Sequence, residues 1–182
     1  MVSSYKDLVH FLTLCYFIAG IISILAALTI KPLRGLLNHG RESNHIGCFI
    51  NVKKRRFVDF YLTGLLCAYL SFFLYPSCLV FLFITHLGRR CMETTSIMKY
   101  SNSSQMHLFH YICGISFYPI IIMILIDMEP KVLSKSTTWI FSLLSWLQMH
   151  HHYLLGSTRR KGYLAINQAL FRYVYCPHYM IE

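Results

Sequence analysis

Long apolar runs separated by short polar connectors make up most of this chain. The first run, Val9–Ile30, contains no Asp, Glu, Lys or Arg, and it ends at Lys31 and Pro32. About 20 mostly apolar residues suffice for a helix to cross the hydrocarbon core of a bilayer. Proline ends a helix because it lacks a backbone N–H and crowds the preceding turn. We therefore expect a first membrane-spanning helix over residues 9–30.

The next apolar run, Phe57–Leu87, is too long for one ordinary span. A single helix over this range would be about 46 Å long at 1.5 Å per residue, whereas the hydrocarbon core is about 30 Å thick. Pro76 interrupts the run, and basic residues flank it at 53–56 and 89–90. Because cytoplasmic loops are enriched in Lys and Arg, we expect a hairpin of two short spans with both ends on the cytoplasmic side.

Two further apolar segments follow. His107–Ile126 predicts another span with a kink at Pro119, and Trp139–Leu155 is a last apolar segment with an unusually polar second half. Pro177 predicts the start of a terminal helix, because proline is favoured in the first helical turn. The whole pattern predicts an all-α integral membrane protein, a polytopic bundle of about 4–5 transmembrane helices in one domain over 1–182.

Composition and charge support the membrane interpretation. Hydrophobic residues make up 55% of the chain and charged residues 13%, against about 25% charged residues in soluble domains. The formal charge of +10 would otherwise suggest a nucleic-acid partner, but the cations lie in connectors, notably in a basic segment over 31–56. That placement predicts a cytoplasmic loop near anionic headgroups. The seven Cys contain no C-x-x-C pair, so we expect neither a disulfide framework nor a zinc site.

Three clusters of polar residues interrupt the apolar pattern. The first, 85–93, places Arg and Glu at helical spacing, which on its own is typical of a membrane-edge anchor. The second, 148–153, holds three consecutive His; adjacent helical residues point about 100° apart, so a shared metal ion is disfavoured, which leaves donors to a polar ligand or an interfacial belt. The third, 171–182, surrounds His178 with aromatic residues.

Taken together and in this order, the clusters resemble the polyprenol/polyprenal reductase branch of the steroid 5α-reductase family. The resemblance covers roughly Lys53–Glu182, and the terminal segment is its most specific piece. The matching residues are Lys54-Arg55-Arg56-Phe57, Asp59-Phe60-Tyr61, His86, Arg89, Arg90, Glu93, Tyr111-Ile112-Cys113-Gly114, Tyr118, His150 to Leu155, Arg159, Phe171, Tyr173-Val174, Cys176-Pro177-His178-Tyr179 and Glu182.

This resemblance implies a multi-pass helical bundle of the endoplasmic-reticulum membrane that binds NADPH from the cytosolic side, with 157–182 as a cofactor-binding segment. Arginine suits the phosphates of such a cofactor because its planar fork donates two parallel hydrogen bonds, and His and Gln can bond its ribose and amide groups. By position in the matching motifs, the cofactor-binding residues would be Arg90, Gln148, His150, His152, Arg159 and His178.

The implied reaction is reduction of a carbon–carbon double bond conjugated to a carbonyl. Hydride adds to carbon only if the developing negative charge has a sink, which a positioned donor on a carbonyl oxygen stabilises. An allylic alcohol has no such sink. We therefore expect polyprenal rather than polyprenol as the immediate substrate and dolichal as the product, supplying dolichol for protein N-glycosylation. The polyisoprenoid would enter from the lipid, and no protein partner is inferred.

The chain departs from the family pattern in three places. Steroid-reducing members carry a catalytic Tyr where this chain has Leu87, which argues against a steroid substrate and leaves the catalytic residue unidentified. Residues 57–90 form a shorter stretch than in typical members. The family also continues past the motif that ends at Glu182, so the resemblance predicts a C-terminally truncated form.

Two alternatives therefore stay open: a truncated isoform or membrane protein without catalysis, and an isoprenylcysteine-type methyltransferase using S-adenosylmethionine. Arg89, Arg90 and Arg159 favour a phosphate-rich cofactor over the latter.

Overall fold

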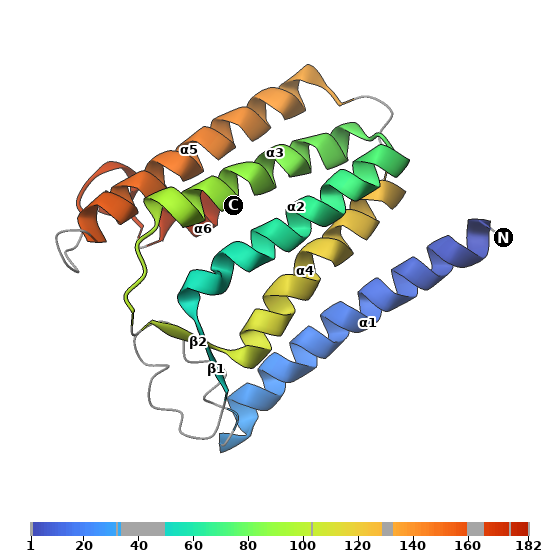
Figure 1. Cartoon of the computed structure of the whole chain (residues 1–182), viewed down its shortest axis with the longest axis horizontal. Helices are drawn as coiled ribbons and strands as arrows, with labels where there is room; N and C mark the ends of the chain where they lie inside the picture. Colours follow the sequence, from blue (N-terminus) through green and yellow to red (C-terminus); the bar gives the residue numbers. More distant parts are fainter. Residues whose placement is uncertain are drawn as a thin grey trace.

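The computed structural model describes residues 2–31, 33, 50–102, 104–128, 133–159, 166–174 and 176–181, and for residues 2–5 and 159 it describes the backbone alone. Most of the described chain is helical (Figure 1). In chain order the elements are α1 (Val2–Thr29), β1 (Asn51–Lys53), η3 (Lys54–Arg56), α2 (Phe57–Leu74), α3 (Cys78–Met92), η4 (Glu93–Ile97), β2 (Gln105–His107), α4 (Leu108–Asp127), α5 (Lys135–Arg159), η5 (Ala169–Arg172) and α6 (Pro177–Ile181).

Helices α2 and α3 form the predicted hairpin, with the turn at residues 75–77. The two arms pack with α4 around an apolar core. Its buried members are Tyr61, Ala68, Val80, Ile84, Leu87 and Ile122. Leu87 is fully buried, so the position at which steroid-reducing relatives carry a Tyr belongs here to the apolar core. This core fixes α3 relative to α2 and thereby places the polar end of α3.

Two glycines allow α2 and α4 to approach closely. A Cβ atom added at Gly64 would lie 2.7 Å from the Cβ of Tyr118, and one added at Gly114 would lie 2.4 Å from the ring of Phe60. Small residues are typical of helix contacts in membrane proteins, because they let backbones come together without steric overlap. The helix α4 continues through Pro119.

Helix α1 lies along α4 at the edge of the bundle (Figure 1). The hydroxyl of Tyr16 donates to the carbonyl of Cys113 at 3.1 Å, and nearer its start Lys6 and His10 contact Asp127 at 2.8 and 2.5 Å. Most apolar side chains of α1 are exposed, as Phe11 and Ile22 illustrate at 62% and 60%. An apolar helix with so little protein contact is suited to a lipid environment.

Within the described residues, three helical segments are long and apolar enough to cross a membrane on their own: Lys6–Thr29, Lys54–Leu74 and Leu108–Asp127. The predicted helical membrane bundle is therefore confirmed, whereas the predicted count of about 4–5 spans still depends on α3 and α5. Helix α3 packs against α2, and α5 runs alongside α3 (Figure 1), but α3 has 15 residues and the second half of α5 is polar. Whether they also span stays a prediction.

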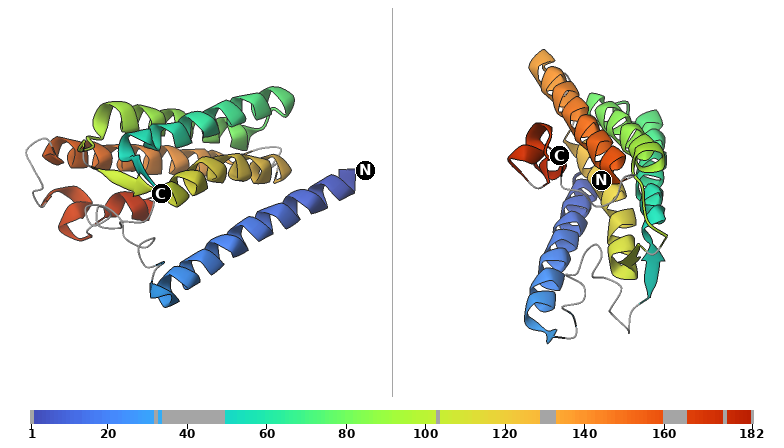
Figure 2. Two further views of the ribbon diagram at one scale, coloured as in Figure 1. Left: turned by 60° about the horizontal axis from the view of Figure 1, so that its bottom comes forward. Right: turned by 90° about the vertical axis from the view of Figure 1, so that its left-hand side faces the viewer.

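The basic connectors gather at one end of the bundle. There β1 pairs antiparallel with β2, with Asn51 opposite His107 and Lys53 opposite Gln105, and η3 leads directly into α2. The second half of α5 and the C-terminal elements η5 and α6 also lie toward this end (Figure 2). Most of the predicted basic loop 31–56 is outside the described residues; its last part forms β1 and η3.

Candidate functional site

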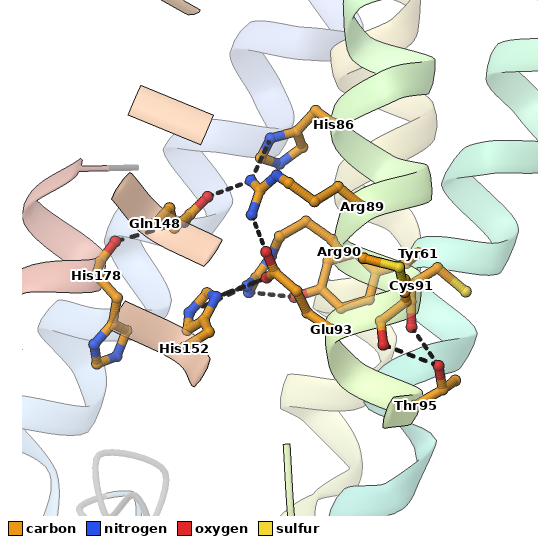
Figure 3. Close-up of polar contacts among 11 residues, drawn as sticks. Tyr61, His86, Arg89, Arg90, Cys91, Glu93, Thr95, Gln148, His152 and His178 are labelled. Atoms are coloured by element: carbon orange, nitrogen blue, oxygen red, sulfur yellow. Dashed lines mark hydrogen bonds and ion pairs between the residues drawn. The ribbon is translucent and has the colours of Figure 1, made fainter. Parts of the chain in front are cut away.

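A buried polar cluster joins α3 and η4 to α5 and α6 near the basic end of the bundle (Figure 3). It combines two guanidinium groups, one carboxylate, several imidazoles, an amide and a phenol. We call it the polar cluster, and its members are Tyr61, His86, Arg89, Arg90, Glu93, Gln148, His152 and His178.

Glu93 lies at the centre of the cluster and is fully buried. It begins η4, one turn after the two arginines, so both can reach its carboxylate. Arg89 donates to Oε1, and the Nη1 atom of Arg90 donates to Oε2 at 2.8 Å. Burial alone would raise the pKa of Glu93, but the hydrogen bond and charge of His152 and the two guanidinium groups outweigh it and hold the pKa well below its usual value. Glu93 is therefore an anion that neutralises its cationic neighbours.

His152 connects α5 to this carboxylate. Its Nδ1 lies 2.6 Å from Oε2 of Glu93, and since an ionised carboxylate can only accept, Nδ1–H must be the donor. His152 is therefore either the neutral Nδ1–H tautomer or the protonated imidazolium. In both forms Nδ1 is a donor, so the 2.9 Å approach of Arg90 Nη1 to this nitrogen is a close contact and not a second hydrogen bond. The imidazole is thus held in one orientation by Glu93.

Gln148 lies one helical turn before His152 and faces the same side of α5. Its side-chain oxygen accepts from Arg89, and its amide nitrogen lies 3.5 Å from the backbone carbonyl of His178 in α6. Arg89 also lies 3.3 Å from Nδ1 of His86. Gln148 therefore links the arginines of α3 to the C-terminal segment.

Arg90 extends the cluster to α2. Its Nη2 donates to the hydroxyl oxygen of Tyr61 at 2.7 Å, and its guanidinium carbon lies 5.1 Å from the centre of the Tyr61 ring. A cation held against both the oxygen and the face of a phenol polarises that hydroxyl and restricts its orientation. Tyr61 in turn packs on Tyr118 in the apolar core, so the cluster is anchored to the rigid part of the bundle.

The C-terminal segment closes the other side of the cluster. Helix α6 begins at Pro177, as the sequence predicts, and His178 is buried next to it. The His178 ring centre lies 5.2 Å from that of His152 and 4.4 Å from that of Tyr179. The His178 imidazole therefore packs against both α5 and the neighbouring aromatic ring.

The structure brings four of the six predicted cofactor-binding residues together: Arg90, Gln148, His152 and His178. It places His150 elsewhere, because this exposed residue stacks on Trp146 with ring centres 5.8 Å apart. Arg159 ends α5, but its side chain is outside the described part. A cofactor-binding role for all six stays a prediction, and His150 has the weakest geometric support.

Sequence reasoning did not assign a site role to Glu93, Arg89, Tyr61 or His86. The spacing predicted the Arg–Glu pairs, but we interpreted them as an anchor at the membrane surface. The sequence feature that could have indicated a buried site is a single acidic residue facing two basic residues inside an otherwise apolar segment. The middle His of the run, His151, was also passed over. It is 1% exposed, and its Nδ1 lies 2.6 Å from the carbonyl of Leu147.

The charges of the cluster do not cancel. Two guanidinium groups face one carboxylate, so the buried cluster has a surplus positive charge, which is costly in a water-poor site unless an anion offsets it. Within the described residues, Nε of Arg89 and Nε2 of His151 are buried without a hydrogen-bond partner. No group of three or more His, Cys, Asp or Glu in the same part of the chain is placed to hold a metal ion. The arrangement suits an anionic ligand or a developing negative charge.

Fold and site together define a multi-pass α-helical membrane protein with a buried cationic cluster next to its basic end. The chain is 31% identical over 137 residues to a polyprenal reductase of Saccharomyces cerevisiae, an alignment that covers 72% of this chain and 53% of that protein. This similarity supports the assignment of the chain to the polyprenol/polyprenal reductase family. The chain spans about half the length of that relative. No family model and no solved structure matches the chain.

Proposed function

We propose that this protein is an NADPH-dependent polyprenal reductase of the endoplasmic-reticulum membrane. It would reduce the α-isoprene double bond of polyprenal to give dolichal and thereby supply dolichol for protein N-glycosylation. The observation that carries the proposal is the similarity to the yeast polyprenal reductase. The cluster supports it by supplying buried cationic donors in a bundle open to lipid on its apolar faces.

The donor set fits a phosphate-bearing nicotinamide cofactor. The cluster has a surplus positive charge, and within the described residues the Nε donor of Arg89 is buried in it without a partner. Arg90, Gln148, His152 and His178 would hold the cofactor, with the guanidinium group on phosphate and the amide and imidazoles on ribose or nicotinamide groups. When bound, NADPH would supply the hydride.

The remaining chemistry is the control of charge on the substrate carbonyl. As a hydride arrives at the β-carbon, negative charge develops on the carbonyl oxygen, and a proton must finally reach the α-carbon. Tyr61 is the candidate donor to that oxygen, because Arg90 polarises its hydroxyl and the surrounding site is water-poor. Glu93 has a positioning role: it holds Arg90 and His152 in place.

A reductase assay on membranes that contain the full chain tests this proposal. Polyprenal and NADPH would be supplied, and dolichal would be detected by mass spectrometry, with polyprenol as a parallel substrate that should give no product. His152→Ala and His178→Ala should abolish product, whereas the matched variant His150→Ala should keep it, because this His lies outside the cluster.

Two negative results have different meanings. If the chain is inactive but becomes active when joined to the C-terminal part of the yeast relative, the cluster is one part of a larger reductase site. If neither protein forms dolichal, the proposed function is wrong.

A further inference from the structure

A second polar site lies on the surface of the bundle, between the start of α2 and η4. It is a cavity of about 250 Å³, and it adjoins the polar cluster because Thr94 follows Glu93. Its walls come from η3, the first turn of α2, η4 and the residues just after η4. The lining residues are Arg55, Val58, Thr94, Thr95, Met98, Lys99 and Tyr100.

The cavity is positively charged. Arg55 and Lys99 line it from different segments, η3 and the residues after η4; both are exposed, and neither forms an ion pair with the residues that the structure describes. Thr94 and Thr95 add hydroxyl groups, and no Asp or Glu is present among the described lining residues. A guanidinium group, an ammonium group and hydroxyl groups that line one cavity are a donor set suited to a phosphate group.

The size of the cavity limits its ligand. Pockets that enclose drug-sized molecules measure roughly 300–1,000 Å³, so a cavity of about 250 Å³ accommodates a compact anion better than a dinucleotide. The phosphate of a small headgroup meets this limit, because it needs only the volume between the two cations.

The location of the cavity points to a lipid. The candidate membrane span of α2 begins at Lys54, so Arg55 and Val58 lie in its first turns, at the level where headgroups meet the apolar core. The basic end of the bundle is the predicted cytoplasmic end, and anionic lipids of that leaflet attract Lys and Arg at the membrane surface.

An apolar stripe leads from the cavity along α2. Val58, Leu62, Leu66, Tyr69 and Phe73 recur at spacings of three and four residues, which places them on one helix face. Leu62 and Leu66 are 49% and 62% exposed, and Phe73 is 82% exposed. The buried residues of α2, such as Tyr61 and Ala68, lie on a different face of the helix. Lipid chains attached to a phosphate in the cavity would lie on this exposed stripe.

We propose that the cavity between η3 and η4 binds the phosphate group of an anionic lipid with a compact headgroup, such as phosphatidic acid, with the lipid chains along the exposed face of α2. Arg55 and Lys99 bind the phosphate, and Val58 and Met98 contact the start of the chains. This site is separate from the proposed cofactor site and requires neither NADPH nor polyprenal.

The test is lipid binding by the purified full chain in neutral detergent, measured by native mass spectrometry. Phosphatidic acid and phosphatidylcholine would be titrated against the unmodified chain, against Arg55→Gln/Lys99→Gln, and against Lys53→Gln/Arg56→Gln. The last variant removes the same charge from neighbouring exposed positions that do not line the cavity. Thermal unfolding in the same detergent checks that all three proteins are equally folded.

The unmodified chain should prefer phosphatidic acid to phosphatidylcholine. Arg55→Gln/Lys99→Gln should weaken phosphatidic-acid binding about 25-fold, at roughly fivefold for each cation removed beside an anionic headgroup, and the control variant should weaken it much less. Equal losses in the two double variants would overturn the site in favour of diffuse surface charge.

Two additional arms identify the source of the phosphate. Inorganic phosphate should displace phosphatidic acid only weakly, because it has no chains to place on α2; if it binds as tightly as the lipid, the site is one for a free anion and the lipid proposal is wrong. NADPH binding should be unchanged in Arg55→Gln/Lys99→Gln; if it is lost while lipid binding persists, the cavity belongs to the cofactor instead. Because lipid binding is measured without substrate, its failure would not count against the reductase proposal.

Discussion

Two of the helix interfaces in this bundle are held by opposite kinds of interaction. Helices α2, α3 and α4 meet through apolar side chains and two close glycine contacts. In contrast, α5 and α6 are joined to α3 and η4 mainly by arginine, glutamate, glutamine and histidine side chains. The first half of α5 leaves large residues exposed, with Trp139 at 76%.

This difference separates a scaffold from a site. In lipid, apolar surfaces gain little by facing protein rather than acyl chains, so close packing of small residues stabilises the α2–α4 contact. Buried charges have no such neutral alternative, and they keep α5 in place only while they remain matched. A substitution that disrupts the polar interface should therefore detach α5 alone, whereas a substitution that disrupts the apolar interface should destabilise the whole bundle.

The largest effect is expected for Glu93→Gln. This change leaves two buried guanidinium groups without their carboxylate, and removing one partner of a buried charge pair typically costs about 3–5 kcal/mol. Thermal unfolding in detergent would measure the loss, and protease cleavage in α5 would show whether the helix detaches. Asp127→Asn makes the same chemical change in a more accessible ion pair and should hardly alter either readout; equal effects would contradict the special role of the polar interface.

The second effect is a loss of α5 attachment in acid. The folded pKa of Glu93 is depressed, so its contribution to stability is fully present above the ordinary glutamate pKa of about 4.3 and is lost as pH falls through the lower folded value. The groups that face it are Arg89, Arg90 and His152. Protease sensitivity of α5 should thus appear only well below pH 4.3, and Glu93→Gln should remove this transition. A transition near neutral pH would point to another group.

A smaller effect is expected when the apolar interface is overpacked. Gly64→Val would place side-chain atoms against Tyr118 and Leu87 and should cost about 1–3 kcal/mol. Gly20→Val is the matched control, because no atom lies within 4 Å of a Cβ at Gly20. Thermal unfolding of Gly64→Val should show a single cooperative transition at a lower temperature. It should not show the selective detachment of α5 that is expected when the polar interface is disrupted.

The smallest effect is expected for His150→Ala. Because this residue is exposed and contacts Trp146, its removal should change the free energy of unfolding by less than about 0.5 kcal/mol. His152→Ala should cost about 1–3 kcal/mol, since it removes one of the buried donors to Glu93. Chemical denaturation of both variants would distinguish them, and a larger cost for His150→Ala would mean that α5 is rotated relative to the structure described.

The sequence predicted where helices begin and end better than it predicted which of their side chains are buried. The hairpin turn at Pro76 and the helix start at Pro177 follow from local backbone chemistry, and both are present. The pairing of Arg89 and Arg90 with Glu93 also follows from spacing. Its burial does not, because that depends on the packing of α5 against η4, which no local pattern specifies.

The run of three histidines shows the same limit. Spacing indicated that they point in different directions, but the rotation of α5 decides which one faces Glu93, and that rotation depends on tertiary contacts such as Gly156 against Ile97. Tyr61 joins the site from α2 for a similar reason, because the hairpin and the bundle bring residues far apart in sequence together.

We propose that the polar cluster binds NADPH, and equilibrium binding of NADPH to the purified full chain in nanodiscs is the most direct measurement of this. We expect saturable binding that Arg90→Gln weakens roughly 10- to 100-fold, the loss expected for a charge-assisted hydrogen bond, while His150→Ala leaves it unchanged. Thermal unfolding would establish that both variants are folded. If the unmodified chain does not bind NADPH, or if a folded Arg90→Gln variant binds it equally well, the polar cluster is not the cofactor site.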